Sequence, residues 1–172
     1  MPRAFSEVSP GQAILHAWFQ SVTCRTAGFN TFDLNALSPV TQLVMTVLMF
    51  IGAAPGSTGG GIKVTTLFVL ILVIRAVVLG RDEVTYAGRR VEQSTVMSAS
   101  ALACLSVLLI LLATVLLVLT QEVGARSLVF EAVSAFGTVG LSLGATAQLN
   151  SIGKIAIIVL MFIGRVGPLT VL

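Results

Sequence analysis

One stretch of the sequence restricts the fold more than any other: residues 94–120 carry no charged side chain and are mostly Leu, Val and Ala. About 20 apolar residues in a helix cross the ~30 Å hydrocarbon core of a bilayer. Two further apolar stretches, at about residues 40–79 and 152–172, are also long enough to cross it. With 56% hydrophobic and only 10% charged residues, the composition excludes an ordinary soluble domain. We therefore expect an all-α membrane protein.

The positive charges predict how these spans are oriented. Four arginines flank or fill the polar stretch 80–93, namely Arg75, Arg81, Arg89 and Arg90. Loops rich in Lys and Arg remain in the cytoplasm, so this stretch is expected there. The net charge of +3 is explained by topology and does not indicate a nucleic-acid partner. Residues 1–5 show no signal-peptide pattern, so the spans themselves would direct insertion into the bilayer.

The chain contains two copies of one unit. Residues 138–164 align without a gap to residues 26–52, 112 positions earlier, and nine residues are identical. The identities include a Thr-x-Gly motif and the unbroken run Val-Leu-Met-Phe-Ile-Gly. Each copy consists of a short apolar segment, the Thr-x-Gly turn, a polar linker and a longer apolar segment. We divide the chain into a partial repeat, 1–93, and a second repeat, 94–172.

The short apolar segments, about 11–24 and 127–137, can cross only part of a bilayer. Such a half-helix must re-enter or be covered by protein, and its C-terminal end places negative partial charge at the turn. Backbone carbonyls exposed in the turn can replace part of the hydration shell of a cation. The predicted carbonyl ligands are those of Thr26, Ala27, Gly28 and Phe29 and, in the second copy, Thr138, Val139, Gly140 and Leu141.

A glycine-rich segment interrupts the longer apolar stretch of the first copy. Residues 52–63 contain five glycines and a proline, which break a helix that would otherwise be about 60 Å long. Irregular backbone at this depth must line a water-filled path or be buried, so the segment is a candidate gate. A Walker A phosphate loop is excluded, because Lys63 is displaced by one residue and no strand precedes it. The candidate gate residues are Gly56, Ser57, Thr58, Gly59, Gly60, Gly61 and Lys63.

Two charged residues lie in apolar surroundings. Arg165 replaces the Ala53 of the first copy, and a charge in a span is functional by default. The alternative is an arginine that reaches the cytoplasmic interface. Glu131 either attracts cations at a pore entrance or is a first-turn glutamate favoured by the helix dipole, and the second interpretation is preferred. We expect Cys24 and Cys104 to be buried free thiols. We expect His16 to be a packing or interface residue and not a metal ligand, because the chain has no other histidine.

Four motifs in order resemble the Trk/Ktr/HKT superfamily of potassium transporters, and are most similar to the membrane subunit of bacterial Ktr systems. The motifs are residues 26–30, 55–63, 134–142 and 164–170. The resemblance implies a pore of four covalently linked repeats of helix, pore loop and helix, similar to a K⁺ channel. It places the filter glycines at Gly28 and Gly140, the gating loop at 53–63 and a mid-pore arginine at Arg165. It also implies a cytoplasmic nucleotide-binding regulatory subunit, a dimer and a place in the bacterial plasma membrane.

The chain departs from the family pattern by lacking the first two repeats and the first helix of the third. We expect it to be a fragment, although assembly of several chains or a separate polypeptide that supplies the rest are the alternatives. The predicted function is passive uptake of K⁺, with Na⁺ as the alternative ion, without catalysis and without a covalently bound cofactor. Two other hypotheses are a non-conducting assembly subunit and half of a secondary solute transporter.

Overall fold

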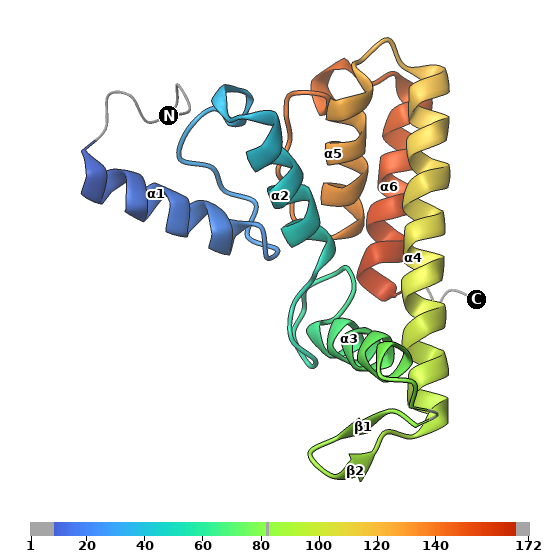
Figure 1. The fold of residues 1–172 in the computed structure, drawn as a ribbon. Helices are drawn as coiled ribbons and strands as arrows, with labels where there is room; N and C mark the ends of the chain where they lie inside the picture. Colours follow the sequence, from blue (N-terminus) through green and yellow to red (C-terminus); the bar gives the residue numbers. More distant parts are fainter. Residues whose placement is uncertain (1–8, 82, 168–172) are drawn as a thin grey trace.

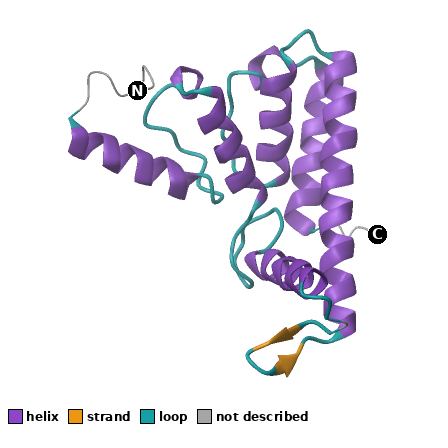
Figure 2. Cartoon of the chain, in the orientation of Figure 1, coloured by secondary structure: helices purple, strands orange, loops and turns teal. Residues whose placement is uncertain are grey.

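The computed structural model describes residues 9–81 and 83–167, and most of these residues are helical. The α-helices are α1 (Pro10–Thr23), α2 (Pro39–Phe50), α3 (Val64–Val78), α4 (Gln93–Thr120), α5 (Ala125–Phe136) and α6 (Ser151–Val166). The short 3₁₀ turns are η2 (Leu34–Ala36) and η3 (Thr146–Gln148). Strands β1 (Thr85–Tyr86) and β2 (Arg89–Arg90) form an antiparallel hairpin at the end of the molecule opposite the α4–α5 turn (Figure 2). The predicted all-α class is confirmed.

Helix α5 is at the centre of the packing. It contacts α2, α4 and α6, and in Figure 1 it stands between α2 and α6. Most of its side chains are buried, from Leu128 to the last residue, Phe136, which stacks on Phe50 with ring centroids 6.4 Å apart. Helix α1 lies at the opposite edge of the molecule from α4, with Trp18 72% exposed. The second half-helix is therefore a core element, whereas the first has an uncovered apolar surface.

Helix α4 is the one helix in the described part that is long and apolar enough to cross a membrane alone, with a mean hydropathy of 3.1. The predicted stretch 40–79 is divided into α2 and α3, so the expected break is present. The third predicted span begins at Ser151 and is helical to Val166, and its last residues, 168–172, lie outside the described residues. Residues 1–5, for which no signal peptide was predicted, also lie outside them.

The internal repeat is visible in the structure as the same elements at the same spacing. Turn η2 is matched by η3, and α2 and α6 begin at the equivalent positions Pro39 and Ser151. The residues before them, Ser38 and Asn150, both cap their helices through a side-chain oxygen. The copies diverge where α2 ends at Phe50 and α6 continues to Val166. The boundary at residues 93 and 94 stays a prediction.

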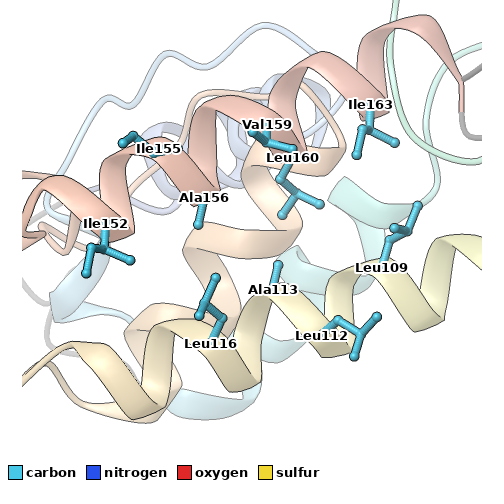
Figure 3. Close-up of a pocket in the computed structure, with 10 residues that line it drawn as sticks. All are labelled: Leu109, Leu112, Ala113, Leu116, Ile152, Ile155, Ala156, Val159, Leu160 and Ile163. Atoms are coloured by element: carbon cyan, nitrogen blue, oxygen red, sulfur yellow. The ribbon is translucent and has the colours of Figure 1, made fainter.

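An apolar groove of about 430 Å³ runs between α4 and α6 (Figure 3). Its walls include Leu112, Ala113 and Leu116 from α4 and Ala156 and Val159 from α6, and every side chain labelled in the view is aliphatic. Such a surface offers no polar ligand to an ion. The groove therefore faces acyl chains or protein and is not part of an ion path.

Cysteine placement agrees with the sequence in one case and not in the other. Cys24 is fully buried, as predicted, and donates to the carbonyl of Gln20. Cys104 is exposed on α4, so the prediction of a buried thiol was wrong. The physical reason is that α4 is apolar around its whole circumference, so composition does not distinguish its packed side from its outer side.

The approach of α6 to α5 depends on Gly164. A Cβ added at this buried residue would overlap the carbonyl oxygen of Phe136. We expect Gly164→Ala to destabilise the folded chain by about 1–3 kcal/mol, because backbone cannot move aside as a flexible side chain can. The thermal unfolding midpoint in detergent should fall. Gly11→Ala is the matched control, because no atom lies within 4 Å of its added Cβ; equal midpoints for both variants would contradict the expectation.

Candidate functional site

Each half-helix ends in a turn with an unusual backbone conformation. Helix α1 ends at Thr23 and is followed by Thr26 with φ of 67° and Gly28 with φ of 75°. Helix α5 is followed by Thr138 with φ of 52° and Gly140 with φ of 91°. A β-branched residue with positive φ is strained and persists only where the surrounding structure fixes it. We call residues 26–29 the first bend and residues 138–141 the second bend.

The two bends lie side by side, although 112 residues separate them. A Cβ added to Gly28 would overlap the carbonyl oxygen of Val139 and would lie 3.5 Å from the Cα of Gly140. In the opposite direction, a Cβ added to Gly140 would lie 3.9 Å from the Cα of Gly28. The C-terminal ends of α1 and α5 both point to this place, so their dipoles add negative potential there.

Thr23 holds the first bend in place. Its carbonyl accepts hydrogen bonds from the backbone N–H groups of Ala27 and Gly28, both at 3.3 Å. Its hydroxyl donates to the carbonyl of Phe29 at 2.6 Å and accepts from the N–H of the same residue at 3.0 Å. The Phe29 carbonyl, one of the predicted ligands, is therefore engaged with α1.

The other seven predicted carbonyls accept no hydrogen bond from any group in residues 9–81 and 83–167. They belong to Thr26, Ala27, Gly28, Thr138, Val139, Gly140 and Leu141. Of these seven residues, Val139 and Leu141 are buried and the other five are half-buried or exposed. Seven such groups on two adjacent bends form a surface that suits a cation.

Glu131 and two hydroxyl groups hold the segment that follows the second bend. The carboxylate is 6% exposed and accepts hydrogen bonds from Ser142 Oγ, at 2.8 Å, and from Thr146 Oγ1. The interpretation of Glu131 as a first-turn residue was wrong, because α5 begins at Ala125 and Glu131 lies in its second turn. Its carboxylate is turned toward the chain that returns from the bend and not toward the helix N-terminus.

The glycine-rich loop, residues 52–63, contacts the threonines of both bends. The N–H of Gly60 donates to Thr138 Oγ1 at 2.9 Å. A Cβ added to Gly59 would lie 2.8 Å from Thr26 Oγ1, so this residue also makes a close approach. The base of the loop is closed by a hydrogen bond of 2.8 Å from the N–H of Gly52 to the carbonyl of Ile62. The loop therefore sits directly against the bends.

Two cationic side chains bind the loop carbonyls. Lys63 Nζ donates to the carbonyl of Gly59 at 2.5 Å and to that of Ser57 at 3.4 Å. Arg165, in the last turn of α6, donates to the carbonyl of Thr58. The Arg165 hydrogen bond joins α6 to the glycine-rich loop. Gly56, at the loop tip, has no atom within 4 Å of an added Cβ and is not part of this contact.

Other candidate sites are not supported in the described part of the chain. It contains no group of three His, Cys, Asp or Glu side chains that would hold a metal ion. His16 accepts or donates a hydrogen bond of 3.0 Å with Thr31 and packs edge-on against Phe32. These contacts agree with the prediction that His16 is a packing or interface residue.

Comparison with known proteins identifies the family. A family model described as TrkH, cation transport protein, matches residues 3–172. The chain belongs to the TrkH family. The predicted resemblance is therefore confirmed, and the TrkH family consists of cation transporters and not of enzymes.

Several relatives share this similarity over most of the chain. The Ktr system potassium uptake protein B of Bacillus subtilis is 42% identical and covers 90% of the chain, and that of Vibrio alginolyticus is 41% identical and covers 98%. The potassium/sodium uptake protein NtpJ of Enterococcus hirae is 39% identical over 93% of the chain. The TrkH-family chain spans only 35%, 37% and 36% of these relatives' lengths, in that order.

A solved structure shares the fold. The potassium transporter TrkH from Vibrio parahaemolyticus matches with a TM-score of 0.79 at 27% identity, over 93% of this chain and 36% of that protein. This match agrees with the predicted arrangement of helices and pore loops in a membrane protein.

Three polar side chains that hold the bends were not predicted from the sequence. Thr23 makes the hydrogen bonds that hold the first bend, and Ser142 and Thr146 make those that hold the segment after the second bend. None of them stands out in the sequence, because Thr and Ser are common in apolar segments. The repeat gives no signal for them either, because their equivalents in the other copy are Ala135, Asn30 and Leu34.

Proposed function

We propose that this chain supplies two of the pore segments of a membrane protein that takes up K⁺, with Na⁺ as an alternative ion, by passive conduction. The observation that carries the proposal is the adjacency of the two bends, with seven backbone carbonyls that accept no hydrogen bond from the described residues. Carbonyl oxygens in this arrangement replace the hydration shell of a monovalent cation. The ion path runs past Gly28 and Gly140 and then meets the glycine-rich loop.

The filter ligands in this proposal are the carbonyls of Thr26, Ala27, Gly28, Thr138, Val139, Gly140 and Leu141. The Phe29 carbonyl contributes less, because the Thr23 hydroxyl already occupies it. The names of the relatives support K⁺ and Na⁺ as the proposed ions, because two are potassium uptake proteins and one is a potassium/sodium uptake protein. The residues of the bends are backbone ligands, so substitutions that keep the backbone conformation should be tolerated better than those that change it.

The glycine-rich loop, Lys63 and Arg165 form the gate in this proposal. The loop lies against Thr26 and Thr138, at the end of the bends, so it closes the path that leaves the filter. Arg165 ties the loop to α6 through the Thr58 carbonyl, and its positive charge opposes the passage of a cation. Opening would require the loop to leave these contacts.

The remaining pore segments come from outside this chain in our proposal. The chain spans about a third of its curated relatives, and the apolar face of α1, with Ile14, Leu15 and Trp18 exposed, is uncovered. The irregular backbone that follows a half-helix must be shielded from lipid by protein. Further segments or a second copy of the chain therefore pack against α1. A cytoplasmic nucleotide-binding regulatory subunit and the bacterial plasma membrane complete the proposed setting.

The test is uptake by a completed pore, which we define as this chain joined to the residues that precede the matching segment in the Bacillus subtilis relative. A bacterial strain deficient in K⁺ uptake should grow on low K⁺ with the completed pore and should fail to grow with this chain alone. The control is the completed pore with Gly28→Ala and Gly140→Ser together, inserted in the membrane in equal amount. Equal rescue by the control would refute the site assignment, and no rescue by the correctly inserted completed pore would refute the function.

A further inference from the structure

We propose that Glu131 is a positioning residue that sets the cation affinity of the second bend through Ser142 and Thr146. This inference rests on the proposed function, since it assigns a role within the same filter. Glu131 does not touch the path itself in our assignment. It acts on the carbonyls of the bend through the chain that returns from them.

The contacts around Glu131 form a closed set in the described part. One carboxylate oxygen, Oε2, accepts from Ser142 Oγ at 2.8 Å, and the other, Oε1, accepts from Thr146 Oγ1. Ser142 Oγ in turn accepts from the N–H of Gly144 at 3.0 Å. A single side chain of α5 therefore fixes the residues on both sides of the turn at Gly144. Hydrogen bonds to a charged acceptor are among the stronger ones, so this set is stiff.

The first bend is held in a different way. The residue equivalent to Glu131 in the first copy is Phe19, and the equivalent of Ser142 is Asn30, whose side chain donates to the Phe32 carbonyl. There the Thr23 hydroxyl holds the bend, and its equivalent in the second copy is Ala135. Two bends with the same backbone conformation are thus fixed by unrelated side chains. Glu131 is not a requirement of the fold of the repeat, because the first copy forms the same bend without it.

The charge of Glu131 adds a second effect. Within the described residues, the one salt bridge joins Arg90 to Glu83, so no basic side chain neutralises the buried carboxylate of Glu131. An unpaired charge in a medium of low dielectric constant acts over longer distances than it does in water. Behind the second bend it favours a cation at the carbonyls, as pore-helix dipoles do. Position and charge therefore act in the same direction.

The experiment separates these effects in the completed pore. Glu131→Gln removes the charge and keeps the size of the side chain, whereas Ser142→Ala with Thr146→Val keeps the charge and removes both donors. Glu131→Asp keeps the charge and shortens the reach. The KM and the maximal rate of K⁺ uptake, and the ratio of K⁺ to Na⁺ uptake, are measured per amount of protein in the membrane.

We expect Glu131→Gln to raise the KM for K⁺ by about fivefold or more, since it removes a charge-assisted pair of hydrogen bonds. The double hydroxyl variant should raise the KM as well, and its combination with Glu131→Gln should give less than the product of the two effects, because the groups act as one unit. Glu131→Asp should lie between wild type and Glu131→Gln. Glu122→Gln is the matched control, an exposed glutamate before α5, and should leave the KM unchanged.

A wild-type KM and wild-type ion ratio in both Glu131→Gln and the double hydroxyl variant, with only a smaller amount of inserted protein, would overturn the proposal and leave a purely structural role. If Glu131→Gln does not insert, Glu131→Asp and the hydroxyl variant decide in the same way. Failure of the proposed function looks different, because then the wild-type completed pore takes up no K⁺ at all.

Discussion

Replacement of Gly28 with alanine is expected to reduce K⁺ uptake by the completed pore about 100-fold or more. Two effects act together: positive φ costs an alanine about 1–2 kcal/mol, and overpacking against backbone costs about 1–3 kcal/mol. The added Cβ would overlap the carbonyl oxygen of Val139, which is a proposed ligand in the other bend. Relief of this contact must move one bend relative to the other. Rb⁺ uptake into cells, divided by the amount of inserted protein, measures the effect.

Gly88→Ala is the matched control for this substitution. Gly88 has a φ of 76°, compared with 75° for Gly28, but no atom lies within 4 Å of its added Cβ. The backbone strain is therefore similar, and the contact with the opposite bend is absent. Uptake by Gly88→Ala should remain within about threefold of wild type, because a strained turn alone costs only about 1–2 kcal/mol. Equal losses in the two variants would show that strain, not the adjacency of the bends, explains the result.

Local features of the sequence predicted most of the helices. Ser9 and Pro10 predict the start of α1, and Ser9 forms a capping box with Gln12 in the structure. The five glycines and the proline of residues 52–63 predict the break between α2 and α3. The 112-residue repeat predicts that whatever follows α1 also follows α5. These signals are short-range or periodic, so they can be read without knowledge of the tertiary structure.

The contacts that define the candidate site could not be predicted in this way. Gly60 and Thr138 are 78 residues apart, and nothing in either local sequence indicates that an N–H of the loop meets that hydroxyl. The repeat is misleading at Glu131, because the two bends are held by unrelated side chains and alignment of the copies conceals this. The prediction that the Cys104 thiol is buried was wrong for a different reason. A helix that is apolar on all sides gives no pattern from which to predict its packed face.

Arg165 is a residue for which the sequence left two interpretations open. A charge in an apolar segment indicates a function, but the sequence left open an arginine that only reaches the cytoplasmic interface. The structure shows its guanidinium bonded to the Thr58 carbonyl in the loop of the other repeat. A purely interfacial arginine would not need a partner 107 residues away.

Replacement of Arg165 with alanine is expected to raise cation flux through the completed pore by about tenfold, because a hydrogen bond to a charged group contributes about 1.5–3 kcal/mol. The substitution removes both the tie between α6 and the loop and the positive charge that opposes a cation. The flux is measured as Rb⁺ efflux from vesicles that contain equal amounts of wild-type or variant protein. Arg75→Ala is the matched control, an exposed arginine in the last turn of α3, and should leave the flux unchanged.

Arg165→Lys separates the effect of the hydrogen bond to Thr58 from the effect of the positive charge. Lysine keeps the positive charge but loses the planar, multi-donor guanidinium, so the loop should be held less firmly while cations are still repelled. A flux between those of wild type and Arg165→Ala would assign part of the gate to each effect. Flux equal to that of wild type in Arg165→Lys would assign the gate to charge alone. If Arg165→Ala leaves the flux unchanged or lowers it at equal expression, Arg165 does not close the path. Its hydrogen bond to the Thr58 carbonyl then only anchors the end of α6 to the loop.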